Sequence, residues 1–304
     1  MADYSYIGSG KVYLVEVGTS AGLVEVGNCS ALNFAVQEEV KEQRDYTSPG
    51  GGVLNEVRRI TGVEITATIA ELSPLNLARA LYGTTSSVVA GSVTDEVVAA
   101  YQGSLSRLLH ASPAAVVVAA ENGDAAARVN ETVYALDAYI NLATPNDYFY
   151  KCTVGGTSAA SPPSFGTTVG GTTTDGTVTW TCMGLSAPVS GTDYEVRPGG
   201  IYWATDGKLT DGETYEIDYT YGAEDVVQAL ASSAKEYVLH FEGLNEARSG
   251  KAMLVDAWRV KFGAVSNLAF IGDDFASIEL TGKVLKDSTK IGGISQFFKT
   301  TAVQ

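Results

Sequence analysis

Two segments that alternate apolar and polar residues flank a long stretch of different character, and this arrangement constrains the fold more than any other feature. Strict alternation is typical of a half-buried β-strand. The apolar positions are Leu32, Phe34 and Val36 before the stretch, and Val63, Ile65, Ala67 and Ile69 after it. Between them lies Glu38–Arg59, about twenty residues where a hairpin connection ordinarily takes about two to five. We call this stretch the arm.

The composition of the arm indicates an element that makes contacts. Its five acidic residues are balanced by four basic ones, so it is not a self-repelling tail. Ser48–Gly52 predicts a bend at its tip. It also carries apolar side chains that it cannot bury alone, namely Val40, Tyr46, Val53, Leu54 and Val57. Two interpretations stay open: the arm is ordered against a neighbouring subunit, or it is a loose surface loop, which chains tolerate at low entropic cost.

Composition and charge exclude several classes of protein. Hydrophobic residues make up 45 % of the 304, which argues against global disorder, and the 33 glycines and 16 tyrosines favour β structure with many turns. A formal net charge of −15 disfavours nucleic acid as a tightly held partner. No signal peptide is evident, and the longest apolar run, Ala114–Ala120, is too short to cross a membrane. We therefore expect a soluble protein that is made in the cytoplasm and has no membrane partner.

One helix is predicted within a chain of strands. Ser73 can cap it, Pro74 suits its first turn, and Gly83 ends it, which gives a helix over about 73–82. Alternation predicts strands at 11–17, 23–27, 193–196, 201–203, 215–221, 237–241, 258–262 and 277–281. The predicted fold class is mainly β: an antiparallel β-sandwich or barrel with one short packed helix, a long extended hairpin arm and an inserted small β domain.

The inserted domain is predicted from a shift in composition. Between Thr153 and Thr179, twenty of twenty-seven residues are Gly, Ser, Thr or Pro, which is typical of a flexible linker. Aromatic residues in and around the stretch argue against a linker, and Asp175-Gly176 predicts a hairpin turn. We expect a β module over 131–185 with its own aromatic core. The body of the protein would then comprise 1–130 and 186–304.

No catalytic, cofactor or metal site is predicted. Gly18–Gly22 matches G-x-S-x-G, but the nucleophile elbow needs a strand that leads into a helix, and strands are predicted on both sides here. His110 and His240 have no partner at the spacing of a metal site or a catalytic triad. Cys152 and Cys182 flank the Gly/Ser/Thr-rich stretch; they are interpreted as two reduced buried thiols, with a disulfide as the alternative.

The chain resembles the tail tube proteins of long-tailed bacteriophages. The resemblance lies in EEVKEQRDYTSPGGG with the strand after it, in SPLNLARALYG, in GTDYEVRPGGIYWATDGKLTDGETYEIDYTYG, and in KEYVLHFEGLNEARSGK with VDAWRVKFGAV. The stretch YKCTVGGTSAASPPSFGTTVGGTTTDGTVTWTCMG resembles a small β module found in phage tail and head proteins, which simple tube proteins lack. The module would lie on the outer surface.

The resemblance implies self-assembly. Such proteins form hexameric rings that stack into a hollow tube, whose inner wall is a β-barrel shared by six subunits. The arm would then lie on a neighbouring ring or subunit. The stacking contacts implied are Lys41, Arg44, Asp45, Arg58 and Arg59, with Tyr46 and Leu54 as apolar anchors. Further partners implied are tape measure, tail terminator and tail tip proteins, and the protein would be located in the virion tail.

The resemblance also implies a passage for DNA. A lumen lined by carboxylates would repel phosphate, so DNA would pass as cargo without binding. Candidate wall residues are Glu64, Thr66, Glu236 and Glu242.

Other functions remain open at this stage. One is the tube of a contractile tail or an injector, which would share the fold. Another is an adhesion or carbohydrate-binding protein in which Tyr150, Phe165 and Trp180 form a sugar platform. An enzyme, such as a glycan hydrolase with paired carboxylates, is disfavoured because the candidate pairs lie in predicted turns.

Overall fold

The protein is mainly β, as predicted. A computed structural model describes residues 5–47, 49–205, 208–209 and 211–303. The described part contains one α-helix, and the strands of its main sheet all pair antiparallel. The chain divides into two compact units: unit 1 comprises Met1–Ser86 and Asp225–Gln304, and unit 2 comprises Ser87–Glu224.

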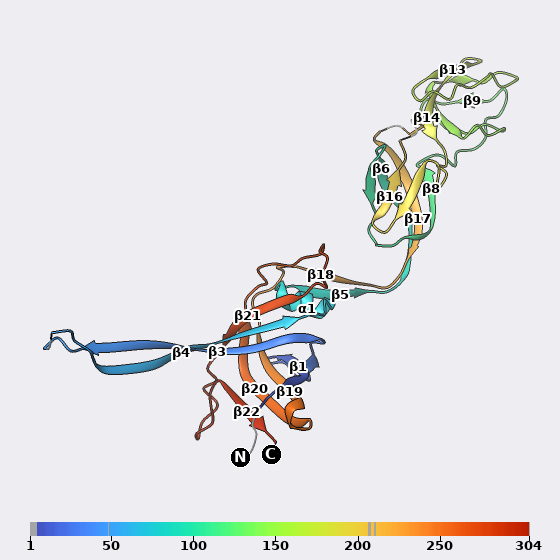
Figure 1. Ribbon diagram of the computed structural model, residues 1–304. Helices are drawn as coiled ribbons and strands as arrows, with labels where there is room; N and C mark the ends of the chain where they lie inside the picture. The colour runs from blue at the N-terminus through green and yellow to red at the C-terminus, as the bar shows by residue number, and fades with distance from the viewer. Residues whose placement is uncertain (1–4, 48, 206–207, 210, 304) are drawn as a thin grey trace. The chain divides into compact units, whose positions relative to one another are not determined.

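Unit 1 is built on one eight-stranded sheet (Figure 1). Its order is β2-β1-β19-β20-β21-β4-β3, and β22 pairs with β20 beside β21. The strands are β1 (Gly8–Glu16), β2 (Val24–Glu25), β3 (Cys29–Arg44), β4 (Val53–Ile69), β19 (Glu236–Asn245), β20 (Lys251–Phe262), β21 (Ile278–Val284) and β22 (Phe298–Ala302). The chain leaves unit 1 along β5 (Thr84–Val88) and returns along β18 (Glu224–Gln228), and these two strands pair with each other.

One face of this sheet carries the core of unit 1. Because side chains alternate along a strand, every second residue of β1, β4, β19 and β21 points into the same apolar layer. Its fully or nearly fully buried members include Leu14, Ile65, Ile69, Leu239, Val260, Ile278 and Leu280. The predicted alternation of Val63, Ile65, Ala67 and Ile69 is confirmed, since all four are buried.

The helix α1 (Pro74–Ala80) forms where the sequence predicts it. The Ser73 side chain accepts a hydrogen bond from the Asn76 amide at 3.3 Å, and Pro74 opens the first turn. The helix ends when Tyr82 adopts a left-handed conformation with φ of 48°, one residue before the glycine expected to end it. Gly83 instead allows the backbone of β18 to pass close by, because a Cβ at this position would lie 2.6 Å from the Gln228 carbonyl oxygen.

The described residues of unit 2 form two cores and four small sheets. Its strands are β6 (Gly91–Ala100), β7 (Leu105–Arg107), β8 (Ala114–Ala120), β9 (Val133–Tyr134), β10 (Tyr139–Ile140), β11 (Tyr148–Val154), β12 (Gly156–Thr157), β13 (Thr172–Asp175), β14 (Val178–Leu185), β15 (Tyr194–Arg197), β16 (Gly200–Trp203) and β17 (Glu213–Tyr221). The sheets β6-β17-β8 and β15-β16-β7 enclose a core around Trp203, Tyr215 and Ile217. The sheet β10-β11-β14-β13 carries the second core, around Tyr150 and Trp180.

The division into units therefore differs from the predicted module boundaries. The predicted module 131–185 contains the second core of unit 2, but unit 2 begins at Ser87 and ends at Glu224. Phe149 and Leu185, inside those limits, are buried in the first core. Strands β6, β8 and β17, which the sequence places in the body, belong to unit 2. Alternation shows that a strand is half-buried, but it carries no information about which sheet the strand joins.

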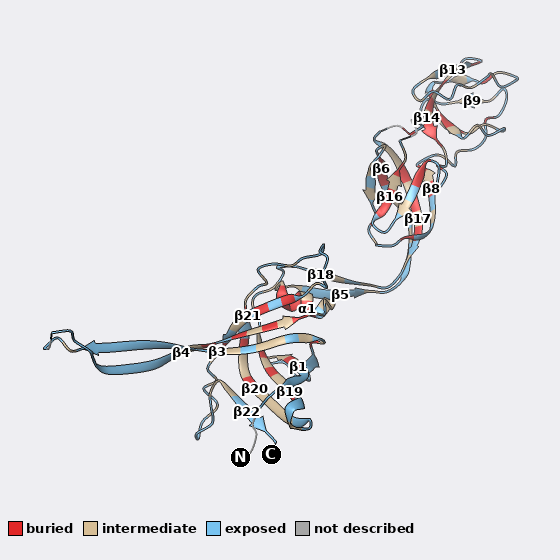
Figure 2. Ribbon diagram, in the orientation of Figure 1, coloured by how far each residue is buried: buried red, intermediate tan, exposed pale blue. Residues whose placement is uncertain are grey.

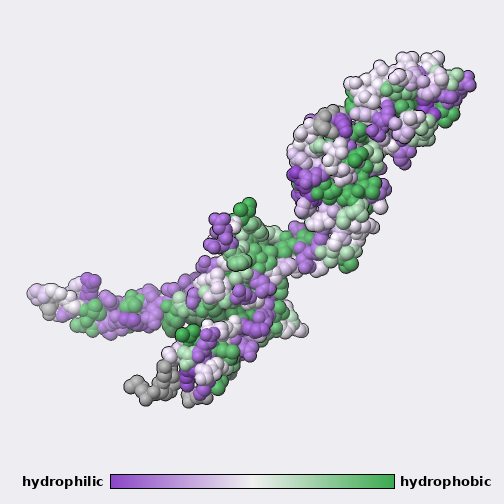
Figure 3. Space-filling model, turned by 45° about the vertical axis from the view of Figure 1, so that its right-hand side comes forward, coloured by the Kyte–Doolittle hydropathy of each residue, from purple (hydrophilic) through white to green (hydrophobic). Residues whose placement is uncertain are grey.

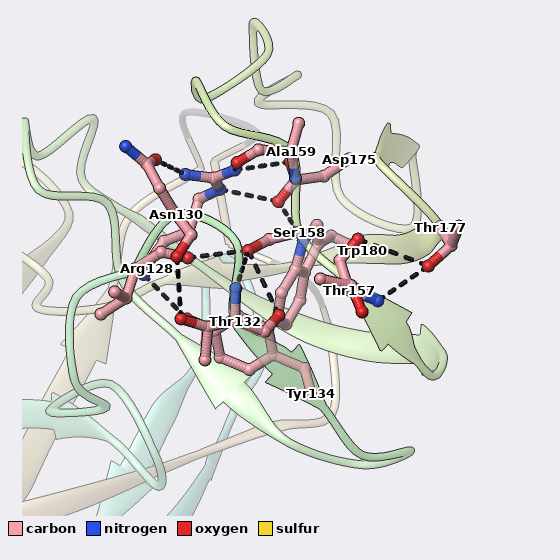
Figure 4. A network of polar contacts seen from close by, with 11 residues as sticks. Arg128, Asn130, Thr132, Tyr134, Thr157, Ser158, Ala159, Asp175, Thr177 and Trp180 are labelled. Carbon is pink, nitrogen blue, oxygen red and sulfur yellow. Dashed lines mark hydrogen bonds and ion pairs between the residues drawn. The ribbon is translucent and has the colours of Figure 1, made fainter.

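A buried ion pair connects the loops of the second core (Figure 4). The Arg128 side chain is 2 % exposed and donates from Nε and Nη2 to the two Asp175 carboxylate oxygens, each at 2.7 Å. Asp175 also accepts from Trp180 Nε1 and from the Ala159 amide, both at 3.0 Å. Burial alone would raise the pKa of Asp175, but these hydrogen bonds outweigh burial and hold its pKa below the ordinary value.

Replacement of Asp175 should destabilise unit 2 strongly. Asp175→Asn leaves the Arg128 charge buried without compensation, so we expect the free energy of unfolding to fall by about 3–5 kcal/mol. Chemical denaturation followed by tryptophan fluorescence measures it. Asp137→Asn is the matched control, because Asp137 pairs with Lys151 at 2.8 Å at an exposed site and should change stability by less than about 1 kcal/mol. Equal losses in the two variants would contradict the assigned role of the buried pair.

The same pair predicts a pH dependence. A carboxyl whose pKa is depressed in the folded state stabilises the fold above its unfolded pKa of about 3.9, and this stabilisation is lost as the pH falls through the folded value. The gap in stability between wild type and Asp175→Asn should therefore close as the pH is lowered below about 4. A gap that is constant down to pH 2 would contradict a depressed pKa.

Unit 1 should fold without unit 2. Because β5 and β18 pair, replacing 87–224 by a short Gly/Ser linker joins two neighbouring strand ends and keeps the whole core of unit 1. We expect a single cooperative unfolding transition in circular dichroism. In contrast, excision of 131–185 removes Phe149 and Leu185 from the first core of unit 2, and we expect it to destabilise what is left of that unit.

Candidate interaction surface

The arm is a free-standing β-hairpin and not an irregular loop. Strands β3 and β4 stay paired from the sheet outward, from Glu38 opposite Ile60 to Arg44 opposite Val53. Every residue from Glu38 to Arg44 and from Val53 to Thr61 is exposed, and Figure 2 shows both strands in the colour of exposed residues. The interpretation as a loose loop is therefore wrong for these strands, and only 45–52 forms the connection. The hairpin presents two faces and two edges.

The two faces of the arm differ in apolar content. Residues directly opposite in the ladder share a face. One face carries the opposed pairs Glu38–Ile60, Val40–Arg58, Glu42–Glu56 and Arg44–Val53. The other face carries Glu39–Arg59, Lys41–Val57 and Gln43–Asn55. Three of the four apolar side chains in these pairs therefore lie on the first face, which we call the inner face.

The inner face continues the core side of the sheet. On β3 it has the same parity as Leu32 and Phe34, which pack against the core of unit 1. Val36, one step further out, is already 50 % exposed, and Ile60 is 62 % exposed. The apolar layer thus runs out of unit 1 along the arm with nothing from the described residues above it. Figure 3 shows apolar groups interspersed with polar ones along this projection.

A β-bulge marks the place where the arm leaves the sheet. Gln37 pairs with Gly62 but Glu38 pairs with Ile60, so Thr61 is an extra residue on β4. Its hydroxyl donates to the Gln37 carbonyl at 3.2 Å. A bulge bends the strand that carries it, which re-aims the hairpin relative to the sheet.

The structure places all seven predicted contact residues on the arm. Lys41, Arg44, Arg58 and Arg59 are exposed on its strands, as is Leu54, while Tyr46 in the connection is 88 % exposed. Arg58 lies 3.5 Å from Glu38 and also pairs with Glu56, which offsets the repulsion between Glu42 and Glu56. Asp45 accepts from the Thr47 amide and hydroxyl and so shapes the connection. Ser48, the first residue of the predicted bend, lies outside the described residues.

The four candidate wall residues share the polar face of the eight-stranded sheet. Glu64 and Thr66 lie on β4 between residues that are buried on the core face, and Glu236 and Glu242 lie on β19 with the opposite parity to the buried Tyr237 and Leu239. Glu64 and Glu236 fall in one cross-strand row, Glu64–Lys283–Lys261–Glu236. Arg259 adds a second cation beside Glu236, at 2.7 Å. This face therefore carries charges of both signs.

A second row crosses the same face and contains His240. Tyr13, His240, Asp256 and Lys299 stand opposite one another on β1, β19, β20 and β22. His240 Nδ1 lies 2.6 Å and Lys299 Nζ 3.1 Å from the two Asp256 oxygens. Burial alone would raise the pKa of Asp256, but the contacts with His240 and Lys299 lower it. Sequence spacing could not reveal this partner, because 16 residues separate His240 from Asp256 and only the ladder joins them.

The acidic excess of the chain lies mainly in unit 2. Unit 2 contains 16 acidic and 5 basic residues, whereas unit 1 contains 19 acidic and 15 basic residues. The net charge of −15 is therefore mostly a property of the inserted unit.

The predicted sugar platform is not formed. Tyr150 and Trp180 have no exposed surface, because they lie on the inward-facing sides of β11 and β14 with Cys152, Val178 and Cys182. Phe165 is half-buried, with its ring 4.8 Å from that of Tyr150. The aromatic core predicted for the module is confirmed. Because Tyr150 and Trp180 are buried in it, two of the three rings of the predicted platform are not on any surface. The spacing of residues in the sequence predicts a strand, but it does not indicate which face of that strand points inward.

The cysteines and the G-x-S-x-G stretch have structural settings. Cys152 and Cys182 are free thiols on neighbouring strands, and burial raises the pKa of Cys182 to about 11, which disfavours the reactive thiolate.

Gly18–Gly22 connects β1 to β2, so strands flank it on both sides as predicted. His110 lies 3.3 Å from Glu224, with its ring stacked on Tyr221. Among the described residues, no group of three or more His, Cys, Asp or Glu could hold a metal ion, and no helix is long and apolar enough to cross a membrane.

Comparison with known proteins identifies a family. No curated protein matches the chain. One family matches residues 5–146 and 173–301, which covers most of unit 1 and unit 2 and leaves out 147–172, the segment that contains β11 and much of the Gly/Ser/Thr-rich stretch. The chain therefore belongs to the family described as "Protein of unknown function UCP028589".

Proposed function

We propose that this chain is the subunit of a self-assembling tube, a structural protein of a phage tail. The observation that carries the proposal is the arm: a paired hairpin whose inner face extends the apolar layer of unit 1 and is left uncovered. A two-stranded ribbon is marginally stable in water by itself, so an arm of this length favours a partner surface. A second copy of the chain is the partner that is always present.

Rings that stack into a tube would use this geometry. An arm that reaches a neighbouring copy makes a heterologous contact, in which two different surfaces of the same chain meet. Such contacts close into rings or continue as open helical stacks. The free edges of β3 and β4 along the arm offer backbone hydrogen bonds as well, which neighbouring copies would satisfy. Hexameric rings, and the tape measure, terminator and tip proteins as further partners, belong to this proposal through the resemblance.

The polar face of the eight-stranded sheet would line the tube. Its row Glu64–Lys283–Lys261–Glu236 carries two carboxylates and two lysines and is close to neutral, so DNA would meet few uncompensated cations. We propose passage without binding on this ground, with DNA as cargo, rather than on repulsion by an acidic wall. Unit 2 would supply the acidic outer decoration.

The competing proposals differ in what supports them. The tube of a contractile tail or injector rests on the same arm and the same sheet. A carbohydrate-binding role loses support because Tyr150 and Trp180 are buried. The tube subunit remains the function that the geometry supports best.

The arm should be needed for assembly but not for folding. We expect that replacing Asp45–Leu54 by an Asn-Gly turn keeps the fold, because the core of unit 1 has no member there, and abolishes elongation. Negative-stain electron microscopy of the concentrated protein, with wild type alongside, is the measurement. Normal tubes from the shortened variant would refute the proposed role of the arm.

The inner face should matter more than the opposite face. Val40 and Val57 are matched valines on the two faces, 43 % and 48 % exposed. Burial of a valine side chain is worth roughly 1.5–3 kcal/mol, so Val40→Ser should raise the concentration for half-assembly by about tenfold or more. Val57→Ser should change it by less than about threefold. Light scattering against concentration measures both, and the reverse ranking would assign the contact to the opposite face.

A further inference from the structure

A cavity of about 430 Å³ in unit 1 is lined by side chains that the proposed assembly does not use. It lies between the end of β1, the turn after it, the last turns of α1 and the segment that leads into β19. Its apolar wall consists of Leu14, Val15, Val24, Leu75, Ala78 and Tyr237. Its polar lining includes the cations Arg79 and Lys235 and the uncharged residues Thr84, Thr85 and Ser233.

Arg79 is a buried cation without an anionic partner. The residue is 8 % exposed, yet no carboxylate of the described residues forms an ion pair with it. Its Nη1 donates to Asn76 Oδ1 at 3.1 Å, and its guanidinium carbon lies 6.0 Å from the centre of the Tyr237 ring. The other N–H groups of Arg79 have no acceptor among the described residues. Burial lowers the pKa of Arg79, but a guanidinium keeps its charge in proteins, so the positive charge persists.

The second cation of the cavity is already paired. Lys235 Nζ lies 2.8 Å from Glu16 Oε2, and Glu16 also lines the cavity. The charged lining therefore amounts to one neutral pair plus the free charge of Arg79. Buried charges in proteins are normally paired and hydrogen-bonded, so the cavity lacks the anion that would complete it.

We propose that this cavity binds an oxyanion, a carboxylate or a phosphate group, on the Arg79 guanidinium. The planar fork of an arginine matches the two oxygens of a carboxylate or phosphate. The apolar wall fits the carbon body of the group that carries the anion. The oxyanion has two sources, a free small anion or an acidic side chain of a second copy. The binding itself does not depend on the proposed tube.

Binding is tested on the full-length protein. Wild type is titrated with inorganic phosphate and, separately, with succinate, while sodium chloride holds the ionic strength constant. The readouts are the Tm and the Arg79 Nε–H signal in a ¹H–¹⁵N spectrum. We expect saturable shifts in both. Shifts no larger than those from chloride, with both anions, would overturn the proposal.

Variants assign the binding to Arg79. Arg79→Gln should weaken the anion by about tenfold or more, the scale of a lost charge-assisted hydrogen bond, and Arg79→Lys should restore part of the affinity. Arg107→Gln is the matched control, an exposed arginine of unit 2, and should bind as wild type does. If Arg79→Gln does not fold, the wild-type titration and Arg79→Lys still decide. Unchanged affinity in Arg79→Lys and Arg79→Gln would place the anion elsewhere and overturn the assignment.

The same titration separates the two sources. If an acidic side chain of a second copy occupies the cavity, phosphate should compete with self-association and raise the concentration for half-assembly. If the occupant is a free anion, assembly should be unaffected while the Arg79 signal still shifts. Both results support the oxyanion site, and neither depends on whether the arm carries the stacking contact.

Discussion

The long ladder between β3 and β4 is the constraint on which the rest of unit 1 depends. It runs from Cys29 opposite Ile69 at the sheet to Arg44 opposite Val53 at the tip of the arm, with register shifts at fixed places along it. A slip of one residue would turn every side chain to the other face, which would take Ile65 and Ile69 out of the core. The same register that buries the core therefore decides which face of the arm carries Val40 and Ile60. Core and arm belong to the same two strands. Packing in the core of unit 1 therefore determines which way each face of the arm points.

Sequence reasoning recovered what is local. The helix at 73–82, the alternation of β4 and β19 and the aromatic core around Trp180 follow from periodicity and capping, which act within a few residues. It did not recover what long-range pairing decides. Strand β17 alternates like the strands of unit 1 but joins another sheet together with β6 and β8, and the inserted unit begins at Ser87 and not near Glu131.

The candidate surfaces show the same limit. The arm residues were identified because charge and apolar content stand out in a stretch between two strands. Whether Tyr150 belongs to the aromatic core or to a sugar platform was left open, since alternation gives two faces without saying which one is inward. Lys283 and Lys261, which neutralise the row of Glu64 and Glu236, lie more than 190 residues from Glu64 and meet it only across the ladder. The place of Arg79 in a cavity likewise depends on three separate segments of the chain.

The bulge at Thr61 sets a rule for how the arm can change length. Because it shifts β4 by one residue against β3, it fixes which residues beyond it share the inner face. An insertion or deletion of a single residue in β4 between the bulge and Val57 would exchange the faces of that strand beyond the change, and would set Val57 where Glu56 or Arg58 now lies. Residues added to both strands in steps of two preserve the pattern. Homologous arms that bind the same kind of surface should therefore differ in length by even numbers of residues per strand, so the arm can evolve in reach without losing its specificity.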